Sequence, residues 1–225
     1  MRNRFLLSLA VFFLGFMVSV VGSAADKIAS EQAAKTTYVE GVNYEMIIPA
    51  QPTQVGPEKV EVVELFWYGC PHCFKFEPYV KKWLENKPES AEFVRMPASL
   101  NPRWKLHAGA YYVAELLNIT DKVHEPLFEE LHKDRNSLQT PEALADFFSK
   151  YGVEKEKYLK IHGSFAVSTR LNRDYSQAKR YGIRSVPTVV VNGKYRTNAT
   201  LAGGSNEDLI KVINYLVEKE SSAAK

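Results

Sequence analysis

The order of hydrophobic and polar positions along the chain predicts strands near both ends of the sequence and helices between them. Both faces of residues 60–67 are largely apolar, which predicts a central strand that is buried on both sides. Residues 91–96 predict a second strand, and residues 38–48 predict a first strand region that Gly41 interrupts. These segments supply the first strands of an expected sheet.

Helical periods separate and follow these strands. One helix is expected from about residue 71 to 85, with Pro78 as a kink inside it. Between residues 103 and 173 the pattern is helical, with no strand-like alternation. The expected helices of this region and its exit cover residues 104–117, 122–133, 141–151, 154–162 and 167–181. Thr140 predicts the N-cap of the third of them, because Pro141 fits the first helical position.

A hairpin and a last helix complete the pattern. Asn192-Gly193 stands between two short runs and is typical of a type I′ turn, in which both positions need a positive φ. The runs, residues 188–191 and 195–197, predict the two strands of the hairpin. Ser205 predicts the cap of a final amphipathic helix. The order strand, helix, strand, helical block, hairpin and helix predicts an α/β fold.

The composition is that of a folded domain with little net charge. Hydrophobic residues make up 45% of the 225 residues and aromatic residues 12%, which supports a packed core rather than a disordered chain. The formal net charge of +3 falls to +1 without Arg2 and Arg4, so no nucleic-acid partner is expected. The chain has two cysteines, too few for a scaffold of several disulfides. The fold must therefore rest on packing.

The first 25 residues have the pattern of a secretory signal. Arg2 and Arg4 precede an apolar stretch over residues 5–21, and the small residues at 22–25 fit a signal-peptidase site. We therefore expect residues 1–25 to be a cleaved signal peptide. The alternative is an uncleaved anchor, because the apolar stretch is nearly long enough to span a bilayer. In either case the remaining roughly 200 residues would fold outside the cytosol, where disulfides persist.

The two cysteines stand together as Cys70-Pro71-His72-Cys73, directly after the central strand. A dithiol at the junction of a strand and a helix is typical of thioredoxin-like redox enzymes. Cys70 at the helix start would meet unpaired N–H groups and the positive end of the helix dipole, and a protonated His72 would add positive charge. Both stabilise a thiolate. Because a stabilised thiolate favours the reduced state, the disulfide becomes a stronger oxidant.

No metal and no cofactor are expected. Zinc would need two ligands besides Cys70 and Cys73, and a c-type haem would need a histidine where Phe74 stands. The other histidines of the chain lie in the helical region without metal-ligand spacing. Core or surface positions are therefore expected for His107, His124, His132 and His162.

Several motifs together resemble the DsbA family of periplasmic thiol:disulfide oxidoreductases, which belongs to the thioredoxin-like superfamily. They are the Cys-Pro-His-Cys motif, Glu64 six residues before Cys70, and Val186-Pro187 ahead of the hairpin. The opening residues 38–41 are also similar. The resemblance implies an α/β thioredoxin fold split by an inserted helical domain.

The resemblance also implies a division of the mature chain into domains. Residues 26–102 would be the first part of the thioredoxin-like domain, 103–173 the inserted helical domain, and 174–225 the second part. Pro78, five residues past the second cysteine, looks more like thioredoxin itself.

Cys73 and Glu64 are expected to act beneath the first thiol. Cys73 lies deeper in the helix and should be shielded, which makes it the resolving partner that re-forms the disulfide. A carboxylate on a central strand is costly to bury without a partner. We therefore expect Glu64 to be a buried acid below Cys73 that handles its proton, with a pKa raised by desolvation. The alternative is a structural glutamate paired with a lysine or tyrosine.

The loop before the hairpin is the expected substrate contact. The resemblance implies a cis Pro187 that faces the dithiol, and the alternative is an ordinary trans proline that opens a strand. Val186 would offer its backbone N–H and C=O to an extended substrate strand. Arg184, Ser185 and Pro71 flank this surface and are further candidate contacts.

Three functions remain open. In the first, the Cys70-Cys73 disulfide is donated to unfolded secreted proteins in the periplasm by a monomer, which a DsbB-like membrane quinone reductase reoxidises. In the second, the protein is an isomerase or reductase, although such relatives usually carry a dimerisation domain for which residues 26–58 are too short. In the third, it is a non-enzymatic peptide-binding chaperone. A redox titration separates the first two, and a Cys70→Ser variant separates both from the third.

Overall fold

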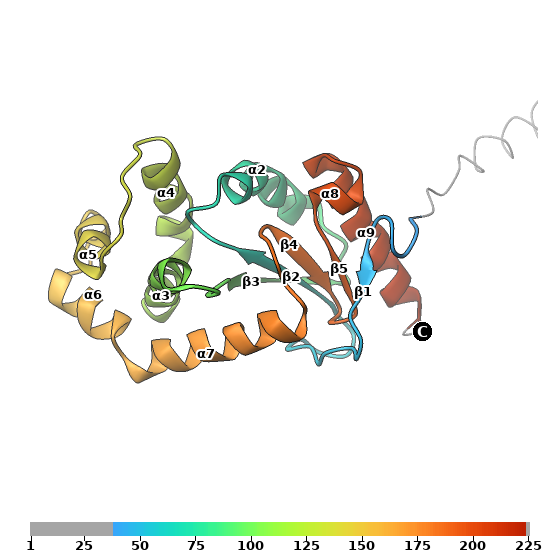
Figure 1. The fold of residues 1–225 in the computed structure, drawn as a ribbon, viewed down its shortest axis with the longest axis horizontal. Helices are drawn as coiled ribbons and strands as arrows, with labels where there is room; N and C mark the ends of the chain where they lie inside the picture. The colour runs from blue at the N-terminus through green and yellow to red at the C-terminus, as the bar shows by residue number, and fades with distance from the viewer. Residues whose placement is uncertain (1–37, 224–225) are drawn as a thin grey trace, which may run out of the picture. The chain divides into compact units, whose positions relative to one another are not determined.

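A computed structural model describes residues 38–223, so the expected signal peptide lies outside the described residues (Figure 1). The strands are β1 (Glu45–Met46), β2 (Val60–Phe66), β3 (Ala91–Pro97), β4 (Thr188–Val191) and β5 (Tyr195–Thr197). The helices are α2 (Pro71–Asn86), α3 (Pro102–Leu116), α4 (Thr120–His132), α5 (Pro141–Ser149), α6 (Lys155–His162), α7 (Phe165–Arg180), α8 (Ala199–Ala202) and α9 (Asn206–Ala223).

The five strands form one mixed sheet in the order β1-β5-β4-β2-β3. β2 pairs in parallel with β3 and antiparallel with β4. All residues of β2 are buried, which confirms the predicted central strand. The register places Glu64 opposite Arg95 on β3 and opposite Val189 on β4. An acidic side chain therefore points out of the middle of the sheet into the protein interior.

Helices cover both faces of the sheet (Figure 1). α2 and α9 pack on the face that contains Val62, and the end of α7 packs on the face that contains Val63 and Leu65. β2 ends at Phe66 and α2 begins at Pro71. The dithiol thus lies at the carboxyl end of the central strand, the usual position of sites in α/β sheets.

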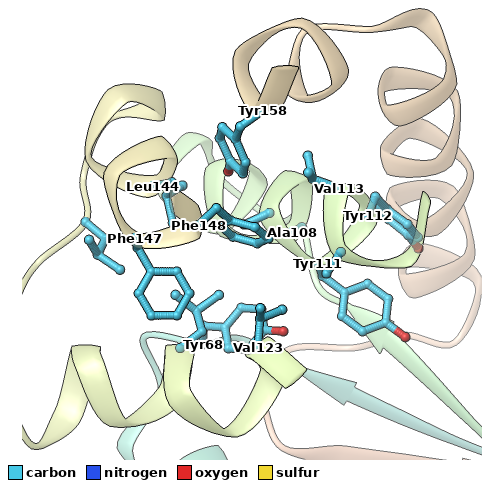
Figure 2. Packing of buried hydrophobic residues seen from close by; sticks show 14 of the residues in the cluster. Tyr68, Ala108, Tyr111, Tyr112, Val113, Val123, Leu144, Phe147, Phe148 and Tyr158 are labelled. Atoms are coloured by element: carbon cyan, nitrogen blue, oxygen red, sulfur yellow. The ribbon is translucent and has the colours of Figure 1, made fainter. Parts of the chain in front are cut away.

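The helices α3 to α7 connect β3 to β4, and no strand lies between β3 and β4 in the described chain. Figure 2 shows their core, in which Tyr68 from the turn after β2 lies among residues of the helical region such as Val123 and Phe147. The predicted boundary at residue 173 falls inside α7, which continues to Arg180. The division into domains therefore stays a prediction.

Local capping and turn signals are confirmed. The Thr140 hydroxyl accepts the N–H of Ala143 at 3.1 Å, and the Ser205 hydroxyl accepts that of Asp208 at 3.0 Å. Asn192-Gly193 has φ values of 52° and 63°, as a type I′ turn requires. Such signals are read correctly from sequence because they involve residues only a few positions apart.

Two elements near the sheet edge differ from the prediction. Within residues 38–48 only Glu45–Met46 is a strand. Gly41, at φ 79°, lies in a turn before it, and the N–H of Gly41 donates to the Tyr44 carbonyl at 2.8 Å. The short helix α8 is not predicted from the hydrophobic pattern. Its signal was Asn198, whose side chain accepts the N–H of Leu201 at 3.0 Å.

None of the helices between residues 38 and 223 is both long enough and apolar enough to span a membrane.

Candidate active site

The dithiol is carried by a tight turn between β2 and α2. Cys70 is the N-cap residue of α2 with an extended backbone, and Pro71 occupies the first turn. The N–H of Cys70 donates to the Trp67 carbonyl at 2.9 Å. A Cβ atom at Gly69 would lie 2.3 Å from the Trp67 ring, so only glycine fits there. The turn thus delivers the Cys70 sulfur to the start of the helix.

The helix start and the second cysteine lower the pKa of the Cys70 thiol. A hydrogen bond from the Cys73 thiol is the largest cause, and the backbone N–H groups of Cys73 and His72 and the charge of His72 act in the same direction. Burial opposes them, yet the pKa still falls to about 6. The free N–H groups of a helix N-terminus and its dipole explain the backbone contribution. Cys70 is therefore largely a thiolate at neutral pH.

Cys73 has the opposite character. Its side chain is fully buried, and both cysteines are free thiols, so the structure is that of the reduced protein. Burial raises the pKa of Cys73, and the neighbouring Cys70 raises it further. The charge of Glu64 is a smaller cause in the same direction. The pair therefore holds one negative charge, on Cys70, and one proton, on Cys73.

Val186 lies against the dithiol although it is 116 residues from Cys70 in sequence. The Val186–Pro187 peptide bond is cis, as predicted. The Cys70 sulfur lies 3.3 Å from the Val186 carbonyl oxygen, a hydrogen bond that only the protonated thiol donates. Arg184 and Ser185 are exposed and line a cavity of about 400 Å³ with residues of β5 and α8, whose walls do not include Cys70. The structure therefore brings Val186 to the thiol, and Arg184 and Ser185 to a different hollow.

Glu64 is fully buried on the central strand, and neither of its carboxylate oxygens has a hydrogen-bond partner. Arg95 Nε lies 3.6 Å from its Oε2, so the partner is an arginine and not the lysine or tyrosine of the structural alternative. Burial raises the pKa of Glu64, the charge of Glu77 adds to this, and Arg95 opposes both. The expected desolvated acid is therefore present.

A chain of polar side chains extends from Glu64 to α4, and sequence reasoning missed it. Arg95 Nη2 donates to Glu77 at 2.9 Å, and Glu77 Oε1 lies 3.2 Å from His124 Nε2. His124 Nδ1 is 2.8 Å from the Tyr68 hydroxyl. Glu77, Arg95 and His124 also line a cavity of about 1030 Å³ between α2 and α4. The buried acid is thus linked to a surface hollow by ionisable groups.

Replacing Glu64 by glutamine should raise the free energy of unfolding at pH 7 by about 1 to 3 kcal/mol. The acid has a folded-state pKa raised above its usual value of 4.5, so stability falls as pH rises above that value, because the unfolded chain releases a proton that the folded chain keeps. Arg95 keeps Glu77 as a partner in the variant. Urea melts at pH 7 and pH 4 measure the effect, and the gain should vanish at pH 4. A less stable variant at pH 7 would mean that the Arg95 ion pair outweighs burial.

Comparison with known proteins finds a matching family model and similar proteins. The family model described as the DSBA-like thioredoxin domain matches residues 61–212. A thiol:disulfide interchange protein DsbA of Pseudomonas aeruginosa is 41% identical over 225 residues, which is 100% of either chain. Its counterpart from Azotobacter vinelandii is 38% identical over 214 residues, 95% of this chain and 94% of the relative.

Solved structures agree. The crystal structure of Pseudomonas aeruginosa DsbA superposes with a TM-score of 0.78 at 42% identity, covering 83% of this chain and 96% of that one. The structure of the oxidoreductase DsbA from Xylella fastidiosa gives a TM-score of 0.74 at 30% identity, with 80% and 96% covered. The sheet and helices of this chain therefore have the arrangement found in those proteins.

Proposed function

Because the chain belongs to the DSBA-like thioredoxin family, we propose that it is a thiol:disulfide oxidoreductase that oxidises cysteine pairs in newly secreted proteins. The observation that carries this proposal is the division of roles between the two cysteines. The pKa of Cys70 is lowered to about 6, while burial raises that of Cys73. Because the Cys70 thiolate stabilises the reduced form of the protein, the disulfide form is readily reduced and is a strong oxidant of other thiols.

The exchange proceeds in two steps. A substrate thiolate attacks the Cys70 sulfur of the disulfide, and Cys73 leaves and takes up a proton. The second substrate thiolate then attacks the substrate sulfur of the mixed disulfide and releases Cys70 as a thiolate. The substrate loses two electrons and two protons, the dithiol gains the electrons and one proton, and the other proton goes to solvent. In the second step Cys70 leaves readily, because its pKa is lower than that of an ordinary cysteine thiol.

Glu64 is proposed to supply the proton that Cys73 takes up. It lies on the strand below α2, and its charge is felt by Cys73. Its raised pKa keeps the carboxyl protonated over part of the neutral range, so it holds a proton to give. Glu77 and His124 line the cavity of about 1030 Å³ and are the titratable groups by which the proton is proposed to be replaced, while Arg95 stays charged.

The substrate is proposed to lie as an extended strand along Val186 and Pro187. The Val186 carbonyl already contacts the Cys70 sulfur, so a peptide backbone paired with Val186 would bring its own cysteine to that atom. Pro71 is exposed beside the thiol and is a further contact. Arg184 and Ser185 stay candidates for residues farther along the peptide, since they line the neighbouring cavity.

The setting proposed for this activity is the periplasm, reached by means of a cleaved signal peptide at residues 1–25. The substrates would be unfolded secreted proteins, and a membrane quinone reductase of the DsbB kind would restore the disulfide of a monomeric enzyme. The continuous oxidising chemistry needs such a partner because each turnover leaves the dithiol reduced.

A redox titration of the mature protein in glutathione buffers tests the function. We expect a midpoint more positive than about −180 mV, the value typical of protein disulfide isomerase. A midpoint near about −270 mV, as in thioredoxin, would instead identify a reductant. Oxidation of a dithiol peptide by the purified disulfide form checks the direction independently.

His72→Ala should raise the pKa of Cys70 by up to about one unit and lower the reduction potential by up to about 30 mV. His72 is exposed in the first turn of α2, and its charge is one of several causes that favour the thiolate. Thiolate absorbance against pH and the glutathione titration measure the two shifts. His72→Lys keeps a positive charge and serves as the control. The melt of the oxidised alanine variant should match that of the parent, and its collapse would make His72 structural.

A further inference from the structure

Three histidines of the helical region contact the turn that carries the dithiol. The chain has five histidines, of which His72 belongs to the motif itself. His107, His124 and His132 approach two consecutive turn residues, Trp67 and Tyr68. They lie on α3 and α4, which the sequence pattern alone does not relate to the turn. Their convergence is therefore a property of the tertiary structure.

His107 holds the side chain of Trp67. The indole Nε1–H donates to His107 Nδ1 at 3.0 Å, and His107 Nε2 lies 3.1 Å from the Leu138 carbonyl. An indole only donates and a carbonyl only accepts, so Nδ1 carries no proton and Nε2 carries one. Burial lowers the pKa of His107 to about 4, which keeps this neutral form at physiological pH. The histidine thus bridges Trp67 to the helical region with both ring nitrogens.

The side chain of Trp67 packs against Gly69, the residue before Cys70. The indole ring lies directly against Gly69, leaving no room for a Cβ atom, and it stacks on Trp104 with ring centroids 5.1 Å apart. The Trp67 carbonyl accepts the N–H of Cys70. A shift of the indole would therefore move the peptide that places the Cys70 sulfur.

His124 and His132 hold Tyr68 at both its ends. The hydroxyl lies 2.8 Å from His124 Nδ1, and the backbone carbonyl accepts His132 Nε2 at 2.7 Å. The His132 ring also stacks on Phe74, with centroids 5.0 Å apart and planes within 10°. His132 therefore touches the chain on both sides of Cys70, two residues before it and four residues after it.

We propose that His107, His124 and His132 are positioning residues, which fix the turn so that the Cys70 sulfur stays within reach of the helix-start N–H groups and of Cys73. Hydrogen bonds to a sulfur anion weaken steeply with distance and angle, so a looser turn stabilises the thiolate less. The inserted helices would then tune the dithiol as well as cover it. This inference rests on the proposed role of Cys70 as the reactive thiolate.

His132→Phe tests the contact to the turn backbone, since phenylalanine keeps the stacked ring and removes the donor. We expect the pKa of Cys70 to rise by at least about half a unit, a factor of about three in thiolate stability. The equilibrium constant for reduction of the protein disulfide by glutathione should fall by about the same factor, which makes the disulfide less oxidising. His132→Gln places an N–H near the position of Nε2 and should restore both values.

His162→Phe is the matched control. His162 Nε2 lies 3.2 Å from the Leu106 carbonyl, and its ring stacks on Tyr158 with centroids 5.6 Å apart. It thus combines a carbonyl contact with ring stacking as His132 does, but wholly within the helical region. Its replacement should lower the free energy of unfolding and leave the pKa of Cys70 and the glutathione equilibrium unchanged.

Each outcome decides the matter. An unshifted pKa in His132→Phe, a failure of His132→Gln to restore it, or an equal shift in His162→Phe would overturn the inference. If His132→Phe does not fold, Tyr68→Phe removes the contact to His124 and is judged by the same shift. A wild-type thiol that titrates like free cysteine, near about 8.5, would instead remove the proposed function itself.

Discussion

Cys70→Ser should abolish oxidation of a dithiol substrate, with a loss of at least about a thousandfold, whereas Cys73→Ser should keep a reactive thiolate and accumulate mixed disulfides. A thiol with a pKa of about 6 is roughly 90% thiolate at pH 7, while the buried Cys73 is almost wholly protonated. Only the Cys70 thiolate therefore reacts as a nucleophile at a useful rate. Cys73 is needed to close the disulfide.

Mass analysis after a brief pulse of iodoacetamide measures the difference between the two thiols. Cys70 should be alkylated at least about a hundredfold faster than Cys73 in the reduced wild-type protein, because the thiolate is the reacting form. Compared with free cysteine the advantage should be only a few-fold, since a thiolate of lower pKa is also a weaker nucleophile. Modification of Cys73 first, or activity retained by Cys70→Ser, would contradict the assignment. A Cys70→Ser variant that no longer oxidises the dithiol but still functions by binding unfolded peptides would point to peptide binding without redox chemistry.

The reduced protein should gain stability over the oxidised protein by about 1.4 kcal/mol per pH unit between about pH 6 and pH 8.5. The folded-state pKa of Cys70 lies below that of the unfolded chain, so the thiolate contributes its stability above the unfolded value and loses it as pH falls through about 6. Cys70 is only 7% exposed, which limits screening by solvent. Above about pH 8.5 the raised pKa of Cys73 opposes a further gain.

The size of the thiolate contribution decides which form is more stable. Closing a four-residue loop favours the oxidised protein by about 2 kcal/mol, if chain entropy alone is counted. The thiolate offsets about 1.4 kcal/mol of this at pH 7 and more than 2 kcal/mol at pH 8. We therefore expect the two forms to exchange order between about pH 7 and pH 8.

Denaturant melts of both forms at half-unit pH steps measure this dependence. Glu64 titrates in the same range, but it affects the free energy of unfolding of the reduced and the oxidised protein alike. The difference between the two free energies therefore reports on Cys70. Cys70→Ser is the control, since it should lack the gain of the reduced wild-type protein over pH 6 to 8.5. A reduced-minus-oxidised difference that stays flat with pH would show that Cys70 is not a stabilised thiolate.

The sequence determined the elements and the chemistry, because both depend on residues close together in the chain. A doubly apolar run gave the central strand, and Thr140 and Ser205 gave helix starts. The Cys-Pro-His-Cys motif at a strand-helix junction predicted the dithiol, and relatives that match most of the chain confirm the thioredoxin-like α/β fold and the family. Positions of charge within the motif already indicated which cysteine reacts.

The tertiary structure alone decided what surrounds the dithiol. Arg95 meets Glu64 only because β2 and β3 pair in parallel with that register, which no local pattern fixes. The histidine contacts to Trp67 and Tyr68 span 40, 56 and 64 residues, so they follow from how the helices pack and not from spacing. Hydrophobic periodicity states which face of an element is buried but not which polar group it will meet there. The packing of the helices and strands decides which polar groups meet, and these groups form the environment of Cys70.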